Sequence, residues 1–386
     1  GLDSSVIAAL AARHSSKPLE TFSVTFEDPE FNEKKFQLET VQYLNTRHQE
    51  IRCTYQDIRD HFPEVIWHAE KPVLRTAPAP LFLLSRLVKE KGYKVVLTGE
   101  GADEMLGGYD IFKEAKIRRF WGAYPDSRRR PLLLKRLYPY LQEIQSQPEA
   151  YLRAFFQVKK EDLLNPLFSH LPRWELTSKL KLFYSDPVRQ EIKGNNAYDR
   201  LRALLPVDYP KWDSFSQSQY LEAKYLLPGY ILSSQGDRML MAHSVEGRFP
   251  FLDPQLAEFA ARIPARLKMK VLNEKYILKK AVGELIPQSV KKRFKQPYRA
   301  PEARSFLSNG EPSSREGYIG ELLSPDRVRK DGIFNPLAVE KLAEKAKRNQ
   351  IKSVRDNMAF VGILSTQLLI DQFINHFDRR ISNGVH

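Results

Sequence analysis

The chain has a single cysteine and no long uninterrupted apolar stretch. Among its 386 residues only Cys53 carries a thiol, which excludes an internal disulfide and any zinc site built from cysteines. The residues around Cys53 read as a strand edge, so we expect a buried structural thiol in a reducing compartment, the cytoplasm. No stretch approaches the roughly 18 to 20 apolar residues that span a bilayer, and we expect no membrane partner.

Signatures of two nucleotide-binding classes are also missing. The glycine-containing start of the chain lacks the Gly-Lys-Ser/Thr of a Walker A loop. The formal net charge is +14, but the basic residues are dispersed, and no RNA-binding fingerprint or interleaved aromatic-basic stripe accompanies them. We therefore expect no nucleic-acid partner. A basic RNA-binding protein or a non-catalytic module remains the alternative hypothesis from a different functional class.

What the sequence does contain is an acidic turn at residues 98–109 (TGEGADEMLGGY), directly after a short apolar run. A buried strand is predicted to end in a turn that carries the carboxylates of Glu100, Asp103 and Glu104. Open α/β sheets place their chemistry at such strand ends. Three acids within five residues are unfavourable unless a cation or a reacting group neutralises them.

The first five residues (GLDSS) precede a helix with apolar periodicity. Glycine, aspartate and two serines at a helix start offer free backbone N–H groups, a positive dipole end and hydroxyl donors, which together can bind an anion. Taken alone, the pattern fits equally well a helix that Asp3 caps.

Together these stretches resemble the synthetase domain of the glutamine-dependent asparagine synthetases. Residues 1–5 match the end of that family's pyrophosphate-binding loop (the PP-loop), and residues 98–104 match its second signature in full. Residues 237–253 resemble a third block, and residues 292–298 (KRFKQPY) lie where the family keeps an Arg-x-Lys. Four motifs in the same order make the resemblance specific.

The resemblance implies an α/β fold with a parallel-sheet PP-loop ATP pyrophosphatase core, of the adenine nucleotide alpha hydrolase-like type, and a large, mostly helical C-terminal part. Strands at 19–26, 49–52 and 94–97 alternate with helices at 4–12, 32–45, 55–69 and 81–91, as expected of βαβ units. From about residue 116 onward the pattern is almost wholly helical, including a helix at 221–234 that Pro228 interrupts.

We expect an asparagine synthetase domain over residues 1–375. It comprises an α/β ATP-binding core (1–115), a helical insertion (116–215) and a mostly helical remainder with the active-site lysine (216–375), and a tail (376–386) follows. The core lacks its first strand, so we expect an unpaired sheet edge. The family's N-terminal glutaminase domain is missing from this chain, and we expect it in the parent protein.

The resemblance also implies where nucleotide and metal bind. The cofactors would be ATP and Mg²⁺, with Asp3 and Asp103 as the metal carboxylates. Adenine would lie against the backbone near Val24. The full nucleotide-binding set implied by the resemblance is Gly1, Leu2, Asp3, Ser4, Ser5, Val24, Thr98 and Gly99.

Two residues are implied as catalytic. Glu100 would orient the carboxylate substrate or accept a proton from ammonia, and Lys295 would neutralise charge on the α-phosphate and leaving group. Arg75 or Thr76 would bind a substrate carboxylate, and Asp103 belongs to the same substrate-binding set.

These assignments predict a ligase that turns aspartate, ATP and ammonia into asparagine, AMP and pyrophosphate through an acyl-adenylate. Ammonia would come from glutamine in the full-length protein, and a homodimer is an allowed assembly. The segment from Lys295 to Pro301 differs from the best-known members of the family. A related amidotransferase or β-lactam synthetase-like ligase that acts on another carboxylic acid is therefore the alternative.

Overall fold

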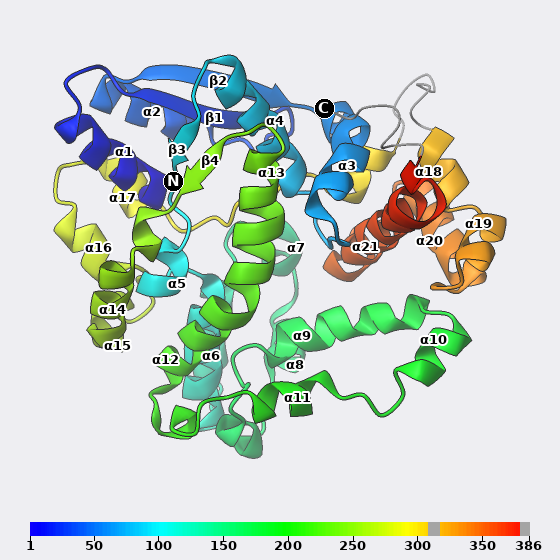
Figure 1. Ribbon diagram of the computed structural model, residues 1–386. Coiled ribbons are helices and arrows are strands. Elements are labelled where there is room, and N and C mark those ends of the chain that lie inside the picture. Colours follow the sequence, from blue (N-terminus) through cyan, green and yellow to red (C-terminus); the bar gives the residue numbers. More distant parts are fainter. Residues whose placement is uncertain (308–316, 379–386) are drawn as a thin grey trace.

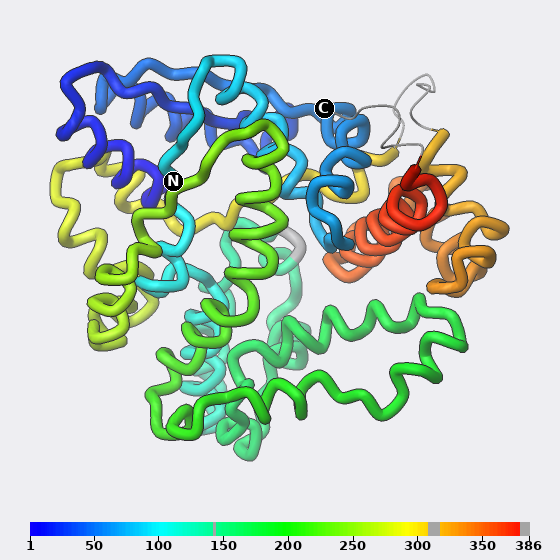
Figure 2. Tube along the Cα trace, viewed as in Figure 1, coloured from blue at the N-terminus to red at the C-terminus, as the bar shows by residue number. Residues whose placement is uncertain are grey.

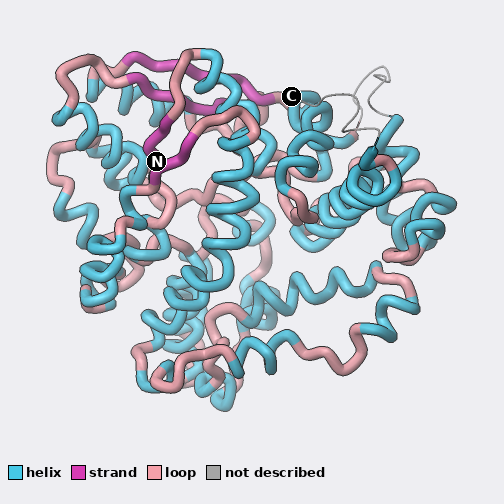
Figure 3. The backbone as a smooth tube through the Cα atoms, in the orientation of Figure 1, coloured by secondary structure: helices cyan, strands magenta, loops and turns pink. Residues whose placement is uncertain are grey.

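Helices make up most of the molecule, and the strands form two small parallel sheets (Figures 1 and 3). The structure is a computed structural model that describes residues 1–307 and 317–378. The last eight residues of the predicted tail therefore lie outside the described residues.

Helices and strands alternate in the first part of the chain, as predicted. The order is α1 (Leu2–His14), β1 (Glu20–Phe26), α2 (Lys34–Leu44), β2 (Arg47–Cys53), α3 (Tyr55–Ala69), α4 (Pro78–Glu90) and β3 (Val95–Leu97). Helix α3 has the predicted limits, because Thr54 and Asp57 form a capping box at its start. Helix α4 begins three residues earlier than predicted, because proline is accepted in a first helical turn.

The strands do not form the single parallel sheet that the sequence predicts. Strand β1 pairs with β2 in parallel, from Glu20 opposite Arg47 to Phe26 opposite Cys53, with α2 as the crossover. Strand β3 pairs in parallel with β4 (Glu246–Arg248), which the sequence reading placed in a helical region. In the part of the chain that the structure describes, each strand has one partner only. The fold is thus a mostly helical α/β arrangement with two separate parallel pairs.

Beyond β3 the chain is almost entirely helical. The elements as far as β4 are α5 (Ala102–Leu106), α6 (Asp110–Gly122), η1 (Arg130–Arg136), α7 (Gln142–Gln145), α8 (Glu149–Phe156), η2 (Lys160–Leu164), α9 (Leu171–Ser178), η3 (Lys179–Phe183), α10 (Asp186–Glu191), α11 (Ala197–Ala203), η4 (Tyr209–Lys211), α12 (Ser214–Leu221), η5 (Glu222–Asp237) and α13 (Arg238–Met241). The predicted break at Pro228 is wrong, because η5 is π-helical there and continues between α12 and α13.

The remaining elements follow β4. They are η6 (Pro250–Leu252), α14 (Pro254–Arg262), α15 (Ala265–Lys268), α16 (Tyr276–Ala281), α17 (Gln288–Lys292), η7 (Ala303–Phe306), α18 (Gly317–Leu322), α19 (Pro325–Asp331), α20 (Pro336–Lys347), α21 (Val354–Ile370) and η8 (Asp371–Asn375).

Two apolar clusters organise these elements. The larger one packs α3 and α4 against the C-terminal helices, with Phe62 and Leu364 fully buried. The smaller one packs α1 against α5, α14 and the α16–α17 region, through residues such as Val6, Ala102 and Val290. Figure 2 shows the result: the blue start of the chain lies beside the yellow segment that follows residue 275.

One helical stretch corrects the prediction about apolar length. Residues 354–375, which comprise α21 and η8, form a helix of 22 residues that contains an 18-residue window with a mean hydropathy of 1.2, long and apolar enough to span a membrane by those criteria alone. However, 61% of its apolar window is buried inside the protein. Leu364 and Val361 are fully covered, so this helix serves as a core helix of the larger cluster.

Candidate active site

The two signature stretches, far apart in the sequence, meet in the structure. Strand β3 leads into the acidic turn, and the N–H of Thr98 donates to the carbonyl of Arg248 at 3.0 Å. Gly99 then lies against the start of α1: a Cβ added there would come within 2.8 Å of the Asp3 Cβ and 2.9 Å of the Ser4 nitrogen. Only glycine allows this approach, and it brings Asp3 close to α5.

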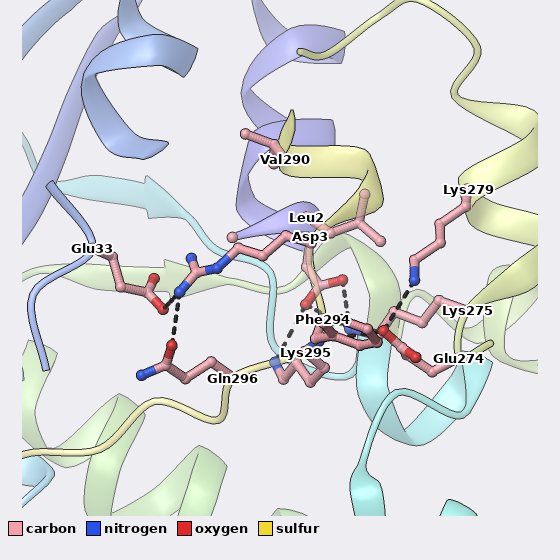
Figure 4. A pocket seen from close by; sticks show the side chains of 12 residues that line it. Leu2, Asp3, Glu33, Glu274, Lys275, Lys279, Val290, Phe294, Lys295 and Gln296 are labelled. Atoms are coloured by element: carbon pink, nitrogen blue, oxygen red, sulfur yellow. Dashed lines mark hydrogen bonds and ion pairs between the residues drawn. The ribbon is translucent and has the colours of Figure 1, made fainter. Parts of the chain in front are cut away.

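Two aspartates and two lysines form a four-charge cluster at this junction. Figure 4 shows three of them, Asp3, Lys275 and Lys295, with their charged groups close together. Lys275 Nζ lies 2.6 Å from both carboxylate oxygens of Asp3 and 2.6 Å from Oδ1 of Asp103. Lys295 Nζ lies 2.6 Å from Oδ2 of Asp103 and 3.7 Å from Oδ2 of Asp3. Three sequence-predicted residues, Asp3, Asp103 and Lys295, are thus brought together, and Lys275 joins them.

Asp103 and Lys295 are held in their ionised forms. Burial alone would raise the pKa of Asp103, but the ammonium groups of Lys275 and Lys295 outweigh it and hold that pKa below its usual value. Burial lowers the pKa of Lys295, yet the two aspartates raise it well above its usual value. Two negative and two positive charges therefore neutralise one another inside the protein.

Lys275 is the site residue that the sequence reading missed. It is 1% exposed and precedes α16 in a left-handed backbone conformation with φ of 49°. The sequence predicts an almost wholly helical pattern in this part of the chain, which does not single out Lys275, and α16 starts only at Tyr276. None of the recognised motifs covers Lys275, and its burial depends on the packing of α1, α5 and α16, which the sequence does not display.

A second network of buried ion pairs lies next to the cluster and holds the backbone that carries its lysines. Glu274 accepts from the backbone N–H of Lys295 at 3.2 Å and pairs with Lys279 and with Lys113, each at 2.9 Å. Lys113 also pairs with Asp110 at 2.9 Å. The buried Glu274 thereby fixes the residue that follows it, Lys275, and the backbone of Lys295.

Asp3 does not cap its helix, so the alternative interpretation of the first five residues, a helix that Asp3 caps, is excluded. The N-cap of α1 is Gly1, without a side-chain cap, and the Asp3 carboxylate is turned toward Lys275. The neighbouring hydroxyls have local partners: Ser4 Oγ lies 3.3 Å from the Gly1 carbonyl, and Ser5 Oγ lies 3.4 Å from Thr40 Oγ1.

Four polar atoms of the acidic turn are buried without a hydrogen-bond partner among the described residues: Thr98 Oγ1, Glu100 Oε2, Asp103 Oδ1 and Glu104 Oε2. Of these, Asp103 Oδ1 has Lys275 as an ion-pair partner. Buried polar groups are seldom left in this way unless water, an ion or a ligand serves them. Glu100 therefore has the free acceptor that its predicted role needs.

The structure places three other predicted residues in supporting positions. Val24 is 7% exposed within the larger core, and its carbonyl accepts from Gln37 at 3.0 Å. Thr76 is fully buried, and its hydroxyl donates to the carbonyl of Pro301 at 2.7 Å. The Thr76 hydroxyl is therefore turned into the protein, where it anchors the far end of the segment that carries Lys295.

Arg75 has an acidic partner, and its guanidinium donates to Glu302 at 2.6 Å. Burial raises the pKa of Glu302, and Arg75 partly offsets that effect. Since the Arg75 side chain is 36% exposed, it stays reachable for a carboxylate that would compete with Glu302.

A small cavity of about 40 Å³ opens beside the cluster, lined among others by Asp3, Lys275, Arg293 and Lys295. Among the described residues, no group of three or more His, Cys, Asp or Glu side chains is arranged to hold a metal ion. Asp3 and Asp103 offer two carboxylates. This donor set fits Mg²⁺, which typically takes one or two protein carboxylates and completes its shell with phosphates and water.

Comparison with known proteins identifies relatives of the chain. Residues 1–371 match the family model described as asparagine synthase. The chain is 32% identical over 321 residues to a putative asparagine synthetase [glutamine-hydrolyzing] of Mycobacterium tuberculosis, covering 81% of this chain and 45% of that protein.

Two further relatives match over more of the chain. Asparagine synthetase [glutamine-hydrolyzing] 1 of Bacillus subtilis is 29% identical over 350 residues, which cover 90% of this chain and 52% of that protein. A Penicillium rubens protein named amidase chyE is 28% identical over 377 residues, with 90% and 54% covered. The chain spans about half the length of the curated relatives it matches.

Proposed function

The chain belongs to the asparagine synthase family. We propose, on that basis, that it forms an amide in a reaction that consumes ATP. The substrates proposed are aspartate, ATP and ammonia, and the products asparagine, AMP and pyrophosphate. The observation that carries the proposal is the buried cluster of Asp3, Asp103, Lys275 and Lys295. The two carboxylates can bind a metal ion, and the two ammonium groups can bind phosphate oxygens. The cluster thus has partners for both parts of a metal–polyphosphate complex.

Each group has a part in this chemistry. The two lysines would bind the phosphate oxygens, and Lys295, the more exposed one, would stabilise negative charge on the α-phosphate and the departing pyrophosphate. Asp3 and Asp103 would hold Mg²⁺. When bound, that ion supplies Lewis-acid polarisation and screens the phosphate charges. The N–H groups at the start of α1 would bind the pyrophosphate.

A carboxylate is a poor electrophile, so the acid must be activated before ammonia attacks. In the proposed route its oxygen attacks the α-phosphate of ATP, pyrophosphate leaves, and the resulting acyl-adenylate is the electrophile. The unpartnered oxygen of Glu100 would then orient the substrate or accept a proton from the attacking ammonia. Arg75 would bind a carboxylate of the acid, which would take the place of Glu302 as its partner.

The architecture proposed around this site is that of a PP-loop ATP pyrophosphatase. Residues 1–115 would be its ATP-binding core, 116–215 a helical insertion and 216–375 the remainder that supplies Lys295. The adenine would lie near Val24, Thr98 and Gly99. A glutaminase domain as the source of ammonia, a homodimeric assembly and a cytoplasmic location also belong to the proposal.

The test is pyrophosphate release by the protein with Mg-ATP and ammonia fixed, and aspartate present or absent. We expect release that depends on aspartate and that is lost in Asp103→Asn, which keeps the shape of the side chain but not its charge. A folded, ATP-binding protein without any response to aspartate would contradict the assignment of the acid and point to a different carboxylic acid.

A further inference from the structure

Every carboxylate oxygen of the four-charge cluster already has a cationic partner. Lys275 lies 2.6 Å from both oxygens of Asp3 and from Oδ1 of Asp103, and Lys295 lies 2.6 Å from the remaining oxygen of Asp103. The charges of the four side chains sum to zero. A free metal ion at these oxygens would therefore lie beside two ammonium groups that already neutralise the carboxylates.

We propose that Lys275 excludes free divalent cations from this site, so that Asp3 and Asp103 accept the metal only together with a polyphosphate. The inference rests on the proposed function, because it assumes a nucleotide phosphate as the second ligand. It specifies the substrate form: the metal–nucleotide complex is bound, and the metal ion alone is rejected.

Electrostatics supports this exclusion. A free divalent cation would place two positive charges next to two buried ammonium groups, and a buried charge without a partner is strongly unfavourable. A triphosphate supplies acceptors for the lysines as they leave the aspartates, so the oxygens become free for the metal. Metal and nucleotide would thus each strengthen the binding of the other, and by linkage the effect is reciprocal.

Packing keeps Lys275 from moving aside on its own. The side chain is 1% exposed, and a Cβ added at Gly108 would lie only 2.2 Å from the Lys275 Cε, so α5 and the turn after it enclose the lysine stem. The adjoining cavity is small, about 40 Å³, so it holds only a few water molecules. Displacement of the ammonium group therefore requires a ligand that replaces its contacts.

The chain offers a matched control for a test. Lys275→Met removes the ammonium group that contacts three carboxylate oxygens, of which only Oδ2 of Asp3 keeps a second partner, Lys295. Lys279→Met removes the same charge from a neighbouring lysine that pairs with Glu274 and not with the aspartates. Lys295→Met frees one oxygen, Oδ2 of Asp103, and serves as a second, milder variant.

The experiment measures binding of Mn²⁺, as a spin-active substitute for Mg²⁺, from the free-ion electron paramagnetic resonance signal. Without nucleotide, we expect Lys275→Met to bind Mn²⁺ at least about tenfold more tightly than the wild type and Lys279→Met, on Coulomb grounds. Equal affinity of the wild type and Lys275→Met would overturn the proposal. Should Lys275→Met not fold by circular dichroism, the same comparison is made with Lys275→Gln, and equal affinity of the wild type and that variant would overturn the proposal. Lys295→Met, in which Lys275 stays in place, should gain less than the Lys275 variant.

A second arm separates this inference from the proposed function. It repeats the titration with a non-hydrolysable methylene analogue of ATP, which should raise the Mn²⁺ affinity of the wild type more than that of Lys275→Met. If the analogue changes the Mn²⁺ affinity of neither protein, the nucleotide assignment fails. In that case a tighter Mn²⁺ affinity of nucleotide-free Lys275→Met would still support exclusion by Lys275.

Discussion

Replacement of Glu104 by glutamine should change how the stability of the protein depends on pH. Glu104 lies on α5 and is 2% exposed. Its Oε1 accepts from the Tyr109 hydroxyl at 2.8 Å, while Oε2 has no partner among the described residues. Burial, reinforced by the charge of Asp103, raises the pKa of Glu104 from 4.5 to about 7.

The sign of the effect follows from the raised pKa. Between pH 4.5 and 7 the folded protein keeps a proton on Glu104 that the unfolded chain has released, so stability falls as the pH rises. At about 1.4 kcal/mol per pH unit, this group contributes about 3 kcal/mol that is fully present below pH 4.5 and is lost as the pH rises through 7. Glutamine has no proton to lose, so the variant lacks this dependence.

Urea unfolding of the wild type and Glu104→Gln at several pH values from 4.5 to 8 measures the effect. The free energy of unfolding of the variant, relative to the wild type, should rise by about 3 kcal/mol across this range. Tyr109→Phe removes a hydrogen bond that favours the charged carboxylate, and should move the loss to higher pH. A constant difference between the wild type and Glu104→Gln at every pH would refute the reasoning.

Three further substitutions test the packing around the site by chemical denaturation. Lys113→Met leaves two buried carboxylates without their shared cation and should cost about 3 to 5 kcal/mol, whereas Lys116→Met should cost far less; equal costs would contradict the buried ion-pair chain. Thr76→Val should cost about 0.5 to 1.5 kcal/mol, because it removes one of two hydrogen bonds to the Pro301 carbonyl, which keeps the bond from Ser305, and Thr76→Ser should recover most of that loss; failure of serine to do so would contradict the hydroxyl contact. Phe62→Ala should cost about 3 to 5 kcal/mol, compared with a small effect of the exposed Phe259→Ala; a small cost at Phe62 would contradict its place in the core.

Local signals explain which elements the sequence predicted. Helix α3 has apolar residues at helical spacing and a capping box, so both its type and its limits follow from nearby residues. Strand β4 has three residues, Glu246–Arg248, without an apolar run. It exists because it pairs with β3, about 150 residues earlier in the chain, and such pairing leaves no local pattern.

Local sequence signals likewise explain which parts of the candidate site could be predicted. Its acidic turn and helix start could be predicted, because each is a compact motif, and Gly99 explains how they meet. Lys275 could not be predicted, since nothing in its neighbourhood distinguishes a buried lysine from an exposed one. The burial of Thr76 could not be predicted either, because a polar residue beside Arg75 gives no local sign that its hydroxyl donates to the carbonyl of Pro301.

The central claim is that this site activates a carboxylate by adenylation, and the most direct test follows the oxygen atoms. Aspartate labelled with ¹⁸O in its side-chain carboxylate is incubated with the protein, Mg-ATP and ammonia, and the products are analysed by mass spectrometry. The account predicts one ¹⁸O atom in AMP, unlabelled pyrophosphate and asparagine that has lost one label. Formation of ADP with ¹⁸O in inorganic phosphate would show activation at the γ-phosphate and contradict the account.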